Sequence, residues 1–338
     1  MTTAIAAIVI FGILIFIHEL GHFAVAKRAG ILVHEFALGF GPKLFSFKRD
    51  GTEYALRAVP LGGFVRMAGM DPHEEDVERH QSFQHKPLWQ RMAVIFAGPF
   101  MNFVLAAVLF AVIFMFSGYP TASTTVQDVL PERPAAAAGI EPGDQIVAID
   151  GREIGSWDEL VAEINASAGT PLMFTVERDG KTIDFTITPE RVDDRILIGI
   201  QPQAVMERVG PVKAVTAGVE YTVRVTALIV TILGQIITNQ APLDVGGPVR
   251  IVSEIGLAAE QGVVMLLQLA AFLSINLGLF NLFPIPALDG SRLMFLTWEG
   301  ITRRPVNPEK ENMFHFVGFA VLLMLILVIT YNDILQLL

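Results

Sequence analysis

The sequence contains no cysteine, which excludes disulfide bonds, thiolate catalysis and cysteine metal sites. Charged side chains are also scarce: they make up 17% of the 338 residues, against about 25% in ordinary soluble domains. The formal net charge of -10 lacks the basic excess of nucleic-acid binders, so we expect no nucleic-acid partner. Apolar residues, in contrast, reach 52% of the chain and favour a membrane protein.

Four stretches are apolar over the length of about 20 residues that a membrane helix needs. They are residues 4–26, 92–117, 262–284 and 314–330. A fifth stretch, residues 212–237, carries Lys213, Glu220 and Arg224 in its first half. Because ionised groups insert poorly at a helix centre, we expect this stretch to form an amphipathic helix in the membrane interface. The first stretch has no basic leader and no cleavage site, and it predicts an uncleaved anchor.

Basic residues between the spans predict the orientation of the chain. Lysine and arginine are frequent between the first two spans and recur between the last two. The positive-inside rule makes both of these loops cytoplasmic. The N-terminus and the region between the second and third spans are then extracytoplasmic.

The first span contains the segment FIHELGHF at residues 16–23, which places three polar side chains among apolar ones. His18 and His22 share one helix face, so they can bind one metal ion together. Glu19 beside them can act on a water molecule, which is the H-E-x-x-H arrangement of zinc peptidases. Ionisable groups inside a span are costly and indicate function. Interhelical hydrogen bonding is the alternative explanation.

Catalytic zinc takes three protein ligands, so a third must come from elsewhere in the chain. Asp289 in NLFPIPALDG, residues 281–290, lies at the inner end of the third span, at about the depth of His18 on the first. Pro284 and Pro286 break the helix there, and irregular backbone at membrane depth lines a cavity. An ordinary Asp-Gly turn is the alternative for Asp289.

These motifs, in this order, resemble the bacterial site-2 protease family, the RseP-like zinc intramembrane metalloproteases. The resemblance rests on HELGHF, GFGPKLFSF, VPLGGFVRMAGM, AGPFMN and SINLGLFNLFPIPALDGSRL, which begin at residues 18, 39, 59, 97 and 274. It implies a polytopic α-helical membrane protein with about four transmembrane helices and an inserted small α+β PDZ-like domain. It also implies one catalytic Zn²⁺ held by His18, His22 and Asp289, with Glu19 as the general base.

The resemblance further implies that the substrates are single-span membrane proteins, such as anti-sigma factors or remnant signal peptides. Cleavage would take place within the lipid bilayer of the bacterial cytoplasmic (inner) membrane, with the zinc site toward the cytoplasmic side. An upstream site-1 protease would act on the same substrate.

Substrate contacts are implied in the same way. Asn276 and Asn281 would grip the substrate backbone, with interhelical hydrogen bonding as the alternative. Gly62 and Gly63, in a cytoplasmic β-hairpin, would pair with extended substrate by edge addition, with a short sheet of no substrate role as the alternative.

The region between the second and third spans has turn signals in EPGD and DG, a strand pattern at Gln145 to Ile149, and a hairpin closed at Asp179-Gly180. It resembles a circularly permuted PDZ domain, and its length leaves room for only one. A loop formed by Leu197, Ile198, Gly199 and Ile200 would bind a peptide carboxylate. The domain would capture substrate, exclude large proteins, or do both.

The expected organisation has four parts. The first membrane half covers 1–117 and contains the zinc-motif helix 4–26, the cytoplasmic β-hairpin loop 27–91 and the second span 92–117. The PDZ-like domain covers 118–205, and an amphipathic helix with a connector follows at 206–261. The second membrane half covers 262–338 and contains the spans 262–284 and 314–330 and the LDG motif 288–290.

Two other classes of protein stay open. One is a membrane zincin that cuts soluble or juxtamembrane peptides, with Glu254, Glu260 or Glu299 as its third ligand. The other is a non-catalytic scaffold that binds peptides through the extracytoplasmic domain, although such a scaffold has no need of Glu19.

Overall fold

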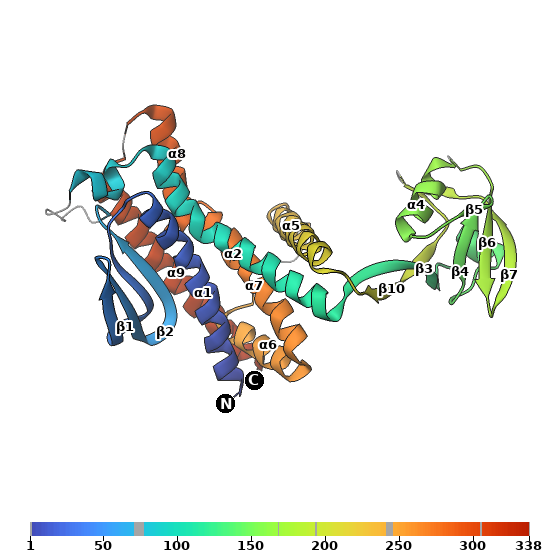
Figure 1. The fold of residues 1–338 in the computed structure, drawn as a ribbon, viewed down its shortest axis with the longest axis horizontal. Coiled ribbons are helices and arrows are strands. Elements are labelled where there is room, and N and C mark those ends of the chain that lie inside the picture. The colour runs from blue at the N-terminus through green and yellow to red at the C-terminus, as the bar shows by residue number, and fades with distance from the viewer. Residues whose placement is uncertain are drawn as a thin grey trace. The chain divides into compact units, whose positions relative to one another are not determined.

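The computed structural model describes residues 2–70, 78–167, 169–192, 195–240, 246–304 and 306–337. The chain divides into two compact units. The first consists of Met1–Met115 and Gly210–Leu338, and the second of Phe116–Val209. Figure 1 shows the first unit as long helices with a β-hairpin and the second as a small sheet domain.

Five of the described helices are long and apolar enough to cross a membrane. They are α1 (Thr2–Arg28), α2 (Leu88–Ser117), α5 (Pro211–Ile237), α7 (Val263–Leu282) and α9 (Pro308–Leu337). The four predicted spans fall in α1, α2, α7 and α9, which confirms a polytopic α-helical fold. α5 also meets the requirement of length and composition, and its placement in the interface stays a prediction.

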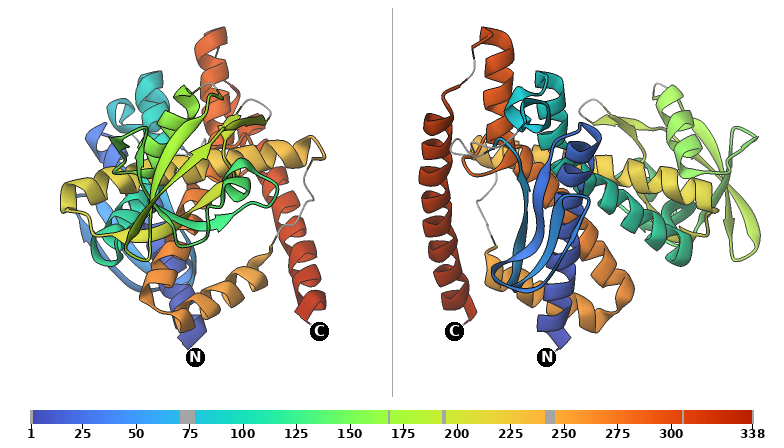
Figure 2. Two further views of the ribbon diagram at one scale, coloured as in Figure 1. Left: turned by 90° about the vertical axis from the view of Figure 1, so that its right-hand side faces the viewer. Right: turned by 60° about the vertical axis from the view of Figure 1, so that its left-hand side comes forward.

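α9 shows the surface expected of a helix that faces lipid. Phe316, Met324 and Leu327 are 73%, 67% and 70% exposed, and Figure 2 shows this helix, in dark red, along one side of the first unit. By contrast, α1 buries Ala7, Ile10 and Leu14 in a cluster with residues of α6 and α7. One face of α1, the helix that carries His18 and His22, is therefore packed within this unit.

Two shorter helices of the first unit were not predicted. α6 (Pro248–Gln261) begins at a proline, which suits the first helical position because its missing N–H has no partner there. α8 (Asp289–Thr302) begins at the predicted third ligand. Since α7 ends at Leu282, the backbone between α7 and α8 is not α-helical, as the two prolines predicted. Two short 3-10 helices, Arg79–Gln81 and Phe83–His85, precede α2.

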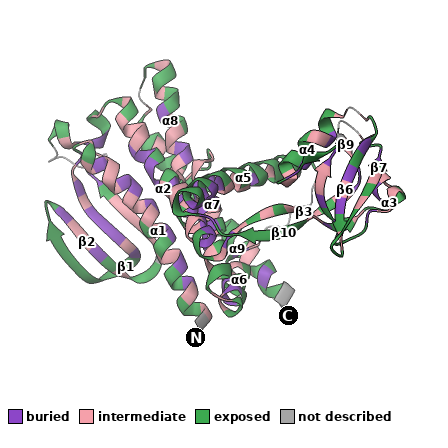
Figure 3. Cartoon of the chain, turned by 45° about the vertical axis from the view of Figure 1, so that its right-hand side comes forward, coloured by how far each residue is buried: buried purple, intermediate pink, exposed green. Residues whose placement is uncertain are grey.

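The hairpin of the first unit is longer than the two strand-like pieces in the sequence indicated. β1 (Val33–Arg49) pairs antiparallel with β2 (Thr52–Met67). The start of β1 is buried and its end is exposed, as Figure 3 shows. Phe36 of β1 packs edge-on against Phe16 and Phe23 of α1, with ring centroids 5.8 and 5.3 Å apart. These aromatic contacts fix the hairpin beside the H-E-x-x-H helix.

The second unit is a small α+β domain. Its main sheet has the order β10-β3-β4-β6-β7, with β5 on β4, and a separate ladder joins β8 and β9. The elements are β3 (Tyr119–Val129), α3 (Pro134–Ala138), β4 (Gln145–Ile149), β5 (Arg152–Glu153), α4 (Trp157–Ala166), β6 (Leu172–Arg178), β7 (Lys181–Ile187), β8 (Glu190–Val192), β9 (Arg195–Leu197) and β10 (Ile200–Glu207). The pairing of Arg178 with Lys181 confirms the hairpin predicted at Asp179-Gly180.

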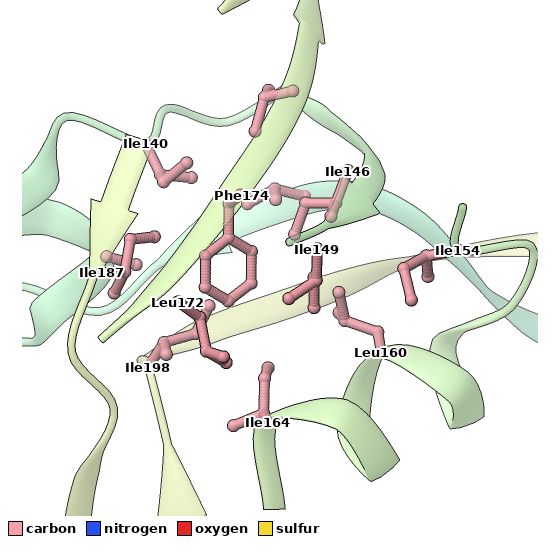
Figure 4. Packing of buried hydrophobic residues seen from close by; sticks show 13 residues of the cluster. Ile140, Ile146, Ile149, Ile154, Leu160, Ile164, Leu172, Phe174, Ile187 and Ile198 are labelled. Carbon is pink, nitrogen blue, oxygen red and sulfur yellow. The ribbon is translucent and has the colours of Figure 1, made fainter. Parts of the chain in front are cut away.

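The core of the second unit lies between the sheet and α4. Phe174 and Leu160 are fully buried, and Figure 4 shows the Phe174 ring among aliphatic side chains from the strands and the helix. α4 begins where Ser156 Oγ accepts a hydrogen bond from the Glu159 N–H at 3.3 Å, an N-cap that ends the preceding loop. The unit therefore has its own hydrophobic core.

Candidate metal centre

Three side-chain atoms converge within the first unit. His18 Nε2 lies 3.1 Å from Asp289 Oδ2 and 3.2 Å from His22 Nε2, and His22 Nε2 lies 3.3 Å from Asp289 Oδ2. Within the described residues, no other group of three histidine and acidic side chains converges in this way. Asp289 and Gly290 begin helix α8 and do not form the ordinary Asp-Gly turn considered as the alternative, and Asp289 meets His18 across 271 positions of sequence.

The triangle formed by these atoms has the dimensions of a zinc site. Ligand atoms about 2.0 Å from a tetrahedral ion lie about 3.3 Å from one another. The three observed separations match this value, and a set of two imidazoles and one carboxylate is a ligand set that catalytic zinc uses. The residues therefore fit a zinc ion with a coordination position left over.

Local structure explains how each ligand reaches the site. α1 places His18 and His22 one turn apart on a single face, where they are 9% and 6% exposed. Asp289 reaches them because the start of α8 folds back closely on the end of α7. A β-carbon at Gly290 would collide with the carbonyls of Leu282 and Phe283, so this position needs glycine.

The electrostatics of the site favour an ionised Asp289. Burial alone would raise the pKa of this carboxyl group, but the charge of His22 and hydrogen bonds from both histidines, when these are protonated, hold the pKa below its ordinary value. The carboxylate is the form that binds a metal ion.

α2 makes the outer contacts of both imidazoles. His22 Nδ1 lies 2.8 Å from the Val94 carbonyl oxygen, which accepts the Nδ1–H and leaves the Nε2 lone pair toward the site. Gly98 lies against the His22 ring, and the Asn102 amide lies 3.0 Å from His18 Nδ1. Sequence reasoning assigns no role to Val94, Gly98 or Asn102, although Gly98 and Asn102 belong to the segment AGPFMN.

A cavity of about 350 Å³ opens at the three ligands. Glu19 lines it from α1, and Gly62, Gly63, Phe64 and Val65 line it from β2. A β-carbon at Gly63 would lie 3.1 Å from Glu19 Cγ, so β2 passes directly beside the glutamate. The cavity thus has room for a peptide next to both the ligands and a carboxylate.

The other predicted site residues lie in different places. Asn281 lines the cavity, whereas Asn276 donates a hydrogen bond to the Phe272 carbonyl of its own helix at 2.9 Å. Leu197, Ile198, Gly199 and Ile200 belong to the second unit, where the Ile198 side chain is part of the hydrophobic core. Any peptide contact at this loop would therefore involve its backbone and neighbouring side chains.

The glutamates considered as alternative third ligands have other partners or lie elsewhere. Glu299 Oε1 accepts from Arg91 at 2.5 Å, and Glu254 lies 3.4 Å from Arg250. Glu260 is exposed on α6. The described ligand cluster contains Asp289 and none of these three.

H-E-x-x-H in an apolar helix, completed by an aspartate from a distant helix, defines a membrane metallopeptidase. The chain belongs to Peptidase family M50, whose sequence profile matches residues 6–325. It is 39% identical to the zinc metalloprotease RasP of Geobacillus kaustophilus, over 99% of this chain and 98% of that protein. It is 37% identical to the regulator of sigma-W protease RasP of Bacillus subtilis, over the same shares. The chain is thus a zinc metalloprotease and a multi-pass membrane protein.

Solved structures are similar to the second unit. A PDZ domain of an SdrC-like protein from Listeria monocytogenes is 25% identical and has a TM-score of 0.22. The match covers 24% of this chain and 87% of the Listeria chain. The HtrA3 PDZ domain is 24% identical, with a TM-score of 0.18, and the match covers 27% of this chain and 85% of the HtrA3 chain.

Proposed function

We propose that this chain is an intramembrane endopeptidase that cuts within the transmembrane segments of single-span membrane proteins. The observation that carries the proposal is the position of the ligands. His18 and His22 lie in the apolar helix α1, and Asp289 follows the end of α7; both helices are long and apolar enough to span a membrane. A catalytic site built into such helices acts on peptide that is itself within the bilayer.

His18, His22 and Asp289 hold the zinc ion in this proposal. When bound, zinc acts as a Lewis acid that polarises the scissile carbonyl and makes a water molecule acidic enough to attack near neutral pH. Glu19 takes the proton of that water and delivers it to the leaving amine. Its place in the cavity, beside His18 and His22, supports this role.

β2 is the proposed binding edge for the substrate. Peptide bonds of a helix are shielded by their own hydrogen bonds, so the substrate segment must become extended before it is cut. Residues 53–56 of β2 pair with β1 on both sides, whereas residues 63–67 pair among the described strands only with residues 33–38 of β1. Gly62 and Gly63, where this second part begins, line the cavity. An extended substrate can add to this edge, while Asn281 offers an amide to its backbone.

Orientation, substrates and the second unit complete the proposal. The basic loops favour a zinc site toward the cytoplasmic side of a bacterial inner membrane, with the N-terminus and the second unit outside. The name of the Bacillus subtilis relative, regulator of sigma-W protease, favours regulators of sigma factors as substrates. As the family resemblance implies, a site-1 protease would first cut the same substrate. The PDZ-like second unit would filter or capture these substrates.

Cleavage of a single-span reporter by the purified full chain in detergent tests the proposal. The comparison uses wild type, the Glu19→Gln variant and wild type with a zinc chelator. We expect a cut inside the reporter's span for wild type alone, while Glu19→Gln retains its zinc.

Two results would contradict the proposal. Equal cleavage by the Glu19→Gln variant would show that Glu19 is not the base. Cleavage only outside the span, mapped by mass spectrometry of both fragments, would indicate a peptidase for juxtamembrane segments.

A further inference from the structure

One face of α2 contacts both histidines of the metal site. Val94, Gly98 and Asn102 are spaced four residues apart, so they lie in one row along the helix. The Val94 carbonyl oxygen accepts a hydrogen bond from His22 Nδ1–H. Gly98 has no side chain and so leaves space for the His22 ring, and the Asn102 amide lies within hydrogen-bond distance of His18 Nδ1. Val94 and Asn102 thus contact the Nδ1 atoms of the two imidazoles, whereas both Nε2 atoms lie near Asp289.

Asn102 is the member of this row with a polar side chain. It is fully buried, and its amide Nδ2 lies 3.0 Å from His18 Nδ1. Its Oδ1 accepts no hydrogen bond from any described residue. The Asn102 backbone is fixed as well, because Ser274 Oγ of α7 donates to its carbonyl oxygen at 2.8 Å. A buried amide oxygen without a donor is costly, and this calls for a reason.

The chemistry of an imidazole ligand supplies that reason. A neutral histidine that binds metal through Nε2 carries its proton on Nδ1, so the partner of Nδ1 must be an acceptor. A carboxamide has a donor and an acceptor of nearly the same shape. Rotation of the Asn102 amide by half a turn places Oδ1 where Nδ2 lies, at the same distance from His18 Nδ1.

We propose that Asn102 is a positioning residue of the metal centre: its amide oxygen accepts the Nδ1–H of His18 and so directs the Nε2 lone pair of His18 toward zinc. The inference rests on the proposed role of His18 as a ligand. It gives the two histidines matching outer partners on α2, the Val94 carbonyl for His22 and the Asn102 amide for His18. The segment AGPFMN thereby acquires a chemical role.

Zinc affinity, measured by competition with a chelator on the full chain in detergent, tests this inference. All variants carry Glu19→Gln, so that catalysis does not enter the measurement. Asn102→Leu removes the acceptor at nearly constant shape, and Asn102→Asp keeps an acceptor. Asn276→Leu is the control, because the Asn276 amide donates to the Phe272 carbonyl of its own helix. Thermal unfolding with excess chelator measures the fold without metal.

We expect Asn102→Leu to weaken zinc binding about 10- to 100-fold, as is typical for loss of an outer partner of a ligand histidine. Asn102→Asp and Asn276→Leu should bind within about threefold of the parent or more tightly. Equal weakening by the Leu and Asp variants, or no weakening by Leu, would overturn the inference. If Asn102→Leu fails to fold, a tenfold weaker affinity of Asn102→Asp overturns it, and an unchanged affinity supports it.

A further variant separates this inference from the proposed function. His18→Ala in the same background should lose most of its zinc affinity. If it binds zinc as the parent does, His18 is not a ligand and the proposed metal site itself is wrong. If His18→Ala loses zinc while Asn102→Leu keeps it, the metal site stands and only the role of Asn102 is wrong.

Discussion

Gly98 of α2 faces the imidazole of His22 so closely that a β-carbon there would overlap Nε2 and lie 2.8 Å from Cδ2. The ring cannot move away freely, because its Nδ1 is held by the Val94 carbonyl on the same helix. We therefore expect Gly98→Ala to displace either the ring or the helix. Zinc affinity, measured by chelator competition, should fall at least about tenfold.

A glycine elsewhere in the same unit gives the control. A β-carbon at Gly12 of α1 would meet nothing within 4 Å. Gly12→Ala should leave zinc affinity unchanged and should slightly favour the helix. Full zinc binding by Gly98→Ala would show that α2 does not constrain His22.

Gly63 of β2 lies close to Glu19, as Gly98 lies close to His22. A β-carbon there would lie 3.0 Å from Ile15 Cγ2 and 3.1 Å from Glu19 Cγ. Gly63→Ala should move the glutamate by a few tenths of an ångström and lower kcat roughly tenfold or more, because proton transfer depends on position. Zinc content should stay at the wild-type level. Loss of zinc together with activity would mean that β2 supports the ligands and not only Glu19.

Loss of Asp289 should weaken zinc binding more than loss of a residue that only contacts a ligand histidine. Asp289→Ala removes one of three ligands, so its zinc affinity should fall by more than the roughly 100-fold typical of an outer partner. Glu299→Gln is the comparison, since Glu299 pairs with Arg91 at 2.5 Å and would be the ligand in another class of zincin. It should keep its zinc. The reverse ranking of the two variants would favour the glutamate-ligand class.

In the second unit, the buried carboxylate of Asp144 pairs with Arg178, whose side chain is 24% exposed. Arg178 Nε donates to Asp144 Oδ1 at 2.6 Å, and a second nitrogen donates to Oδ2 at 2.8 Å. Asp144→Asn leaves the guanidinium with Glu141 at 3.1 Å and the Gly139 carbonyl as partners, so it should destabilise this unit by roughly 2 kcal/mol, a typical cost of losing a hydrogen bond to a charged group. Hydrogen exchange of the β4 and β6 amides in the full chain measures the change. Glu163→Gln, whose partner Arg152 is 74% exposed, should cost less than about 1 kcal/mol.

The same pair predicts how the stability of the second unit depends on pH. Burial alone would raise the pKa of Asp144, but hydrogen bonds from Arg178 and from the Glu141 N–H hold the pKa below its ordinary value of 3.8. Because the folded state binds this proton less tightly than the unfolded state, the contribution is complete above the unfolded pKa. It is lost as pH falls below 3.8 and through the folded pKa. Asp144→Asn should flatten this part of the stability profile, and an unchanged acid slope would contradict the assignment.

The sequence was sufficient to predict the three candidate zinc ligands, but not the residues that surround them. His18 and His22 could be placed together because helical periodicity is local. Asp289 could be proposed from its depth and from the prolines before it. Asn102 and Gly98 could not be reached in this way, because their contacts depend on how α2 rotates and slides against α1, which no local pattern encodes.

The fold was predictable to a similar degree. Long apolar runs gave α1, α2, α7 and α9, since the bilayer sets their length. The full extent of β1 and β2 was missed because Gly39, Gly41 and Pro42 interrupt the alternation that marks a strand. α6 and α8 were missed because each is short and of mixed polarity, and both depend on packing within the first unit.

The row of contacts on α2 also affects how this protein is assembled. Neither ligand histidine is oriented by α1 alone, so an inserted α1 that has not yet met α2 presents two imidazoles with unfixed rings. Zinc binding therefore adds its free energy to the docking of α1 on α2, because both favour the same arrangement. In the proposed site, helix docking, zinc binding and catalytic competence would therefore arise together.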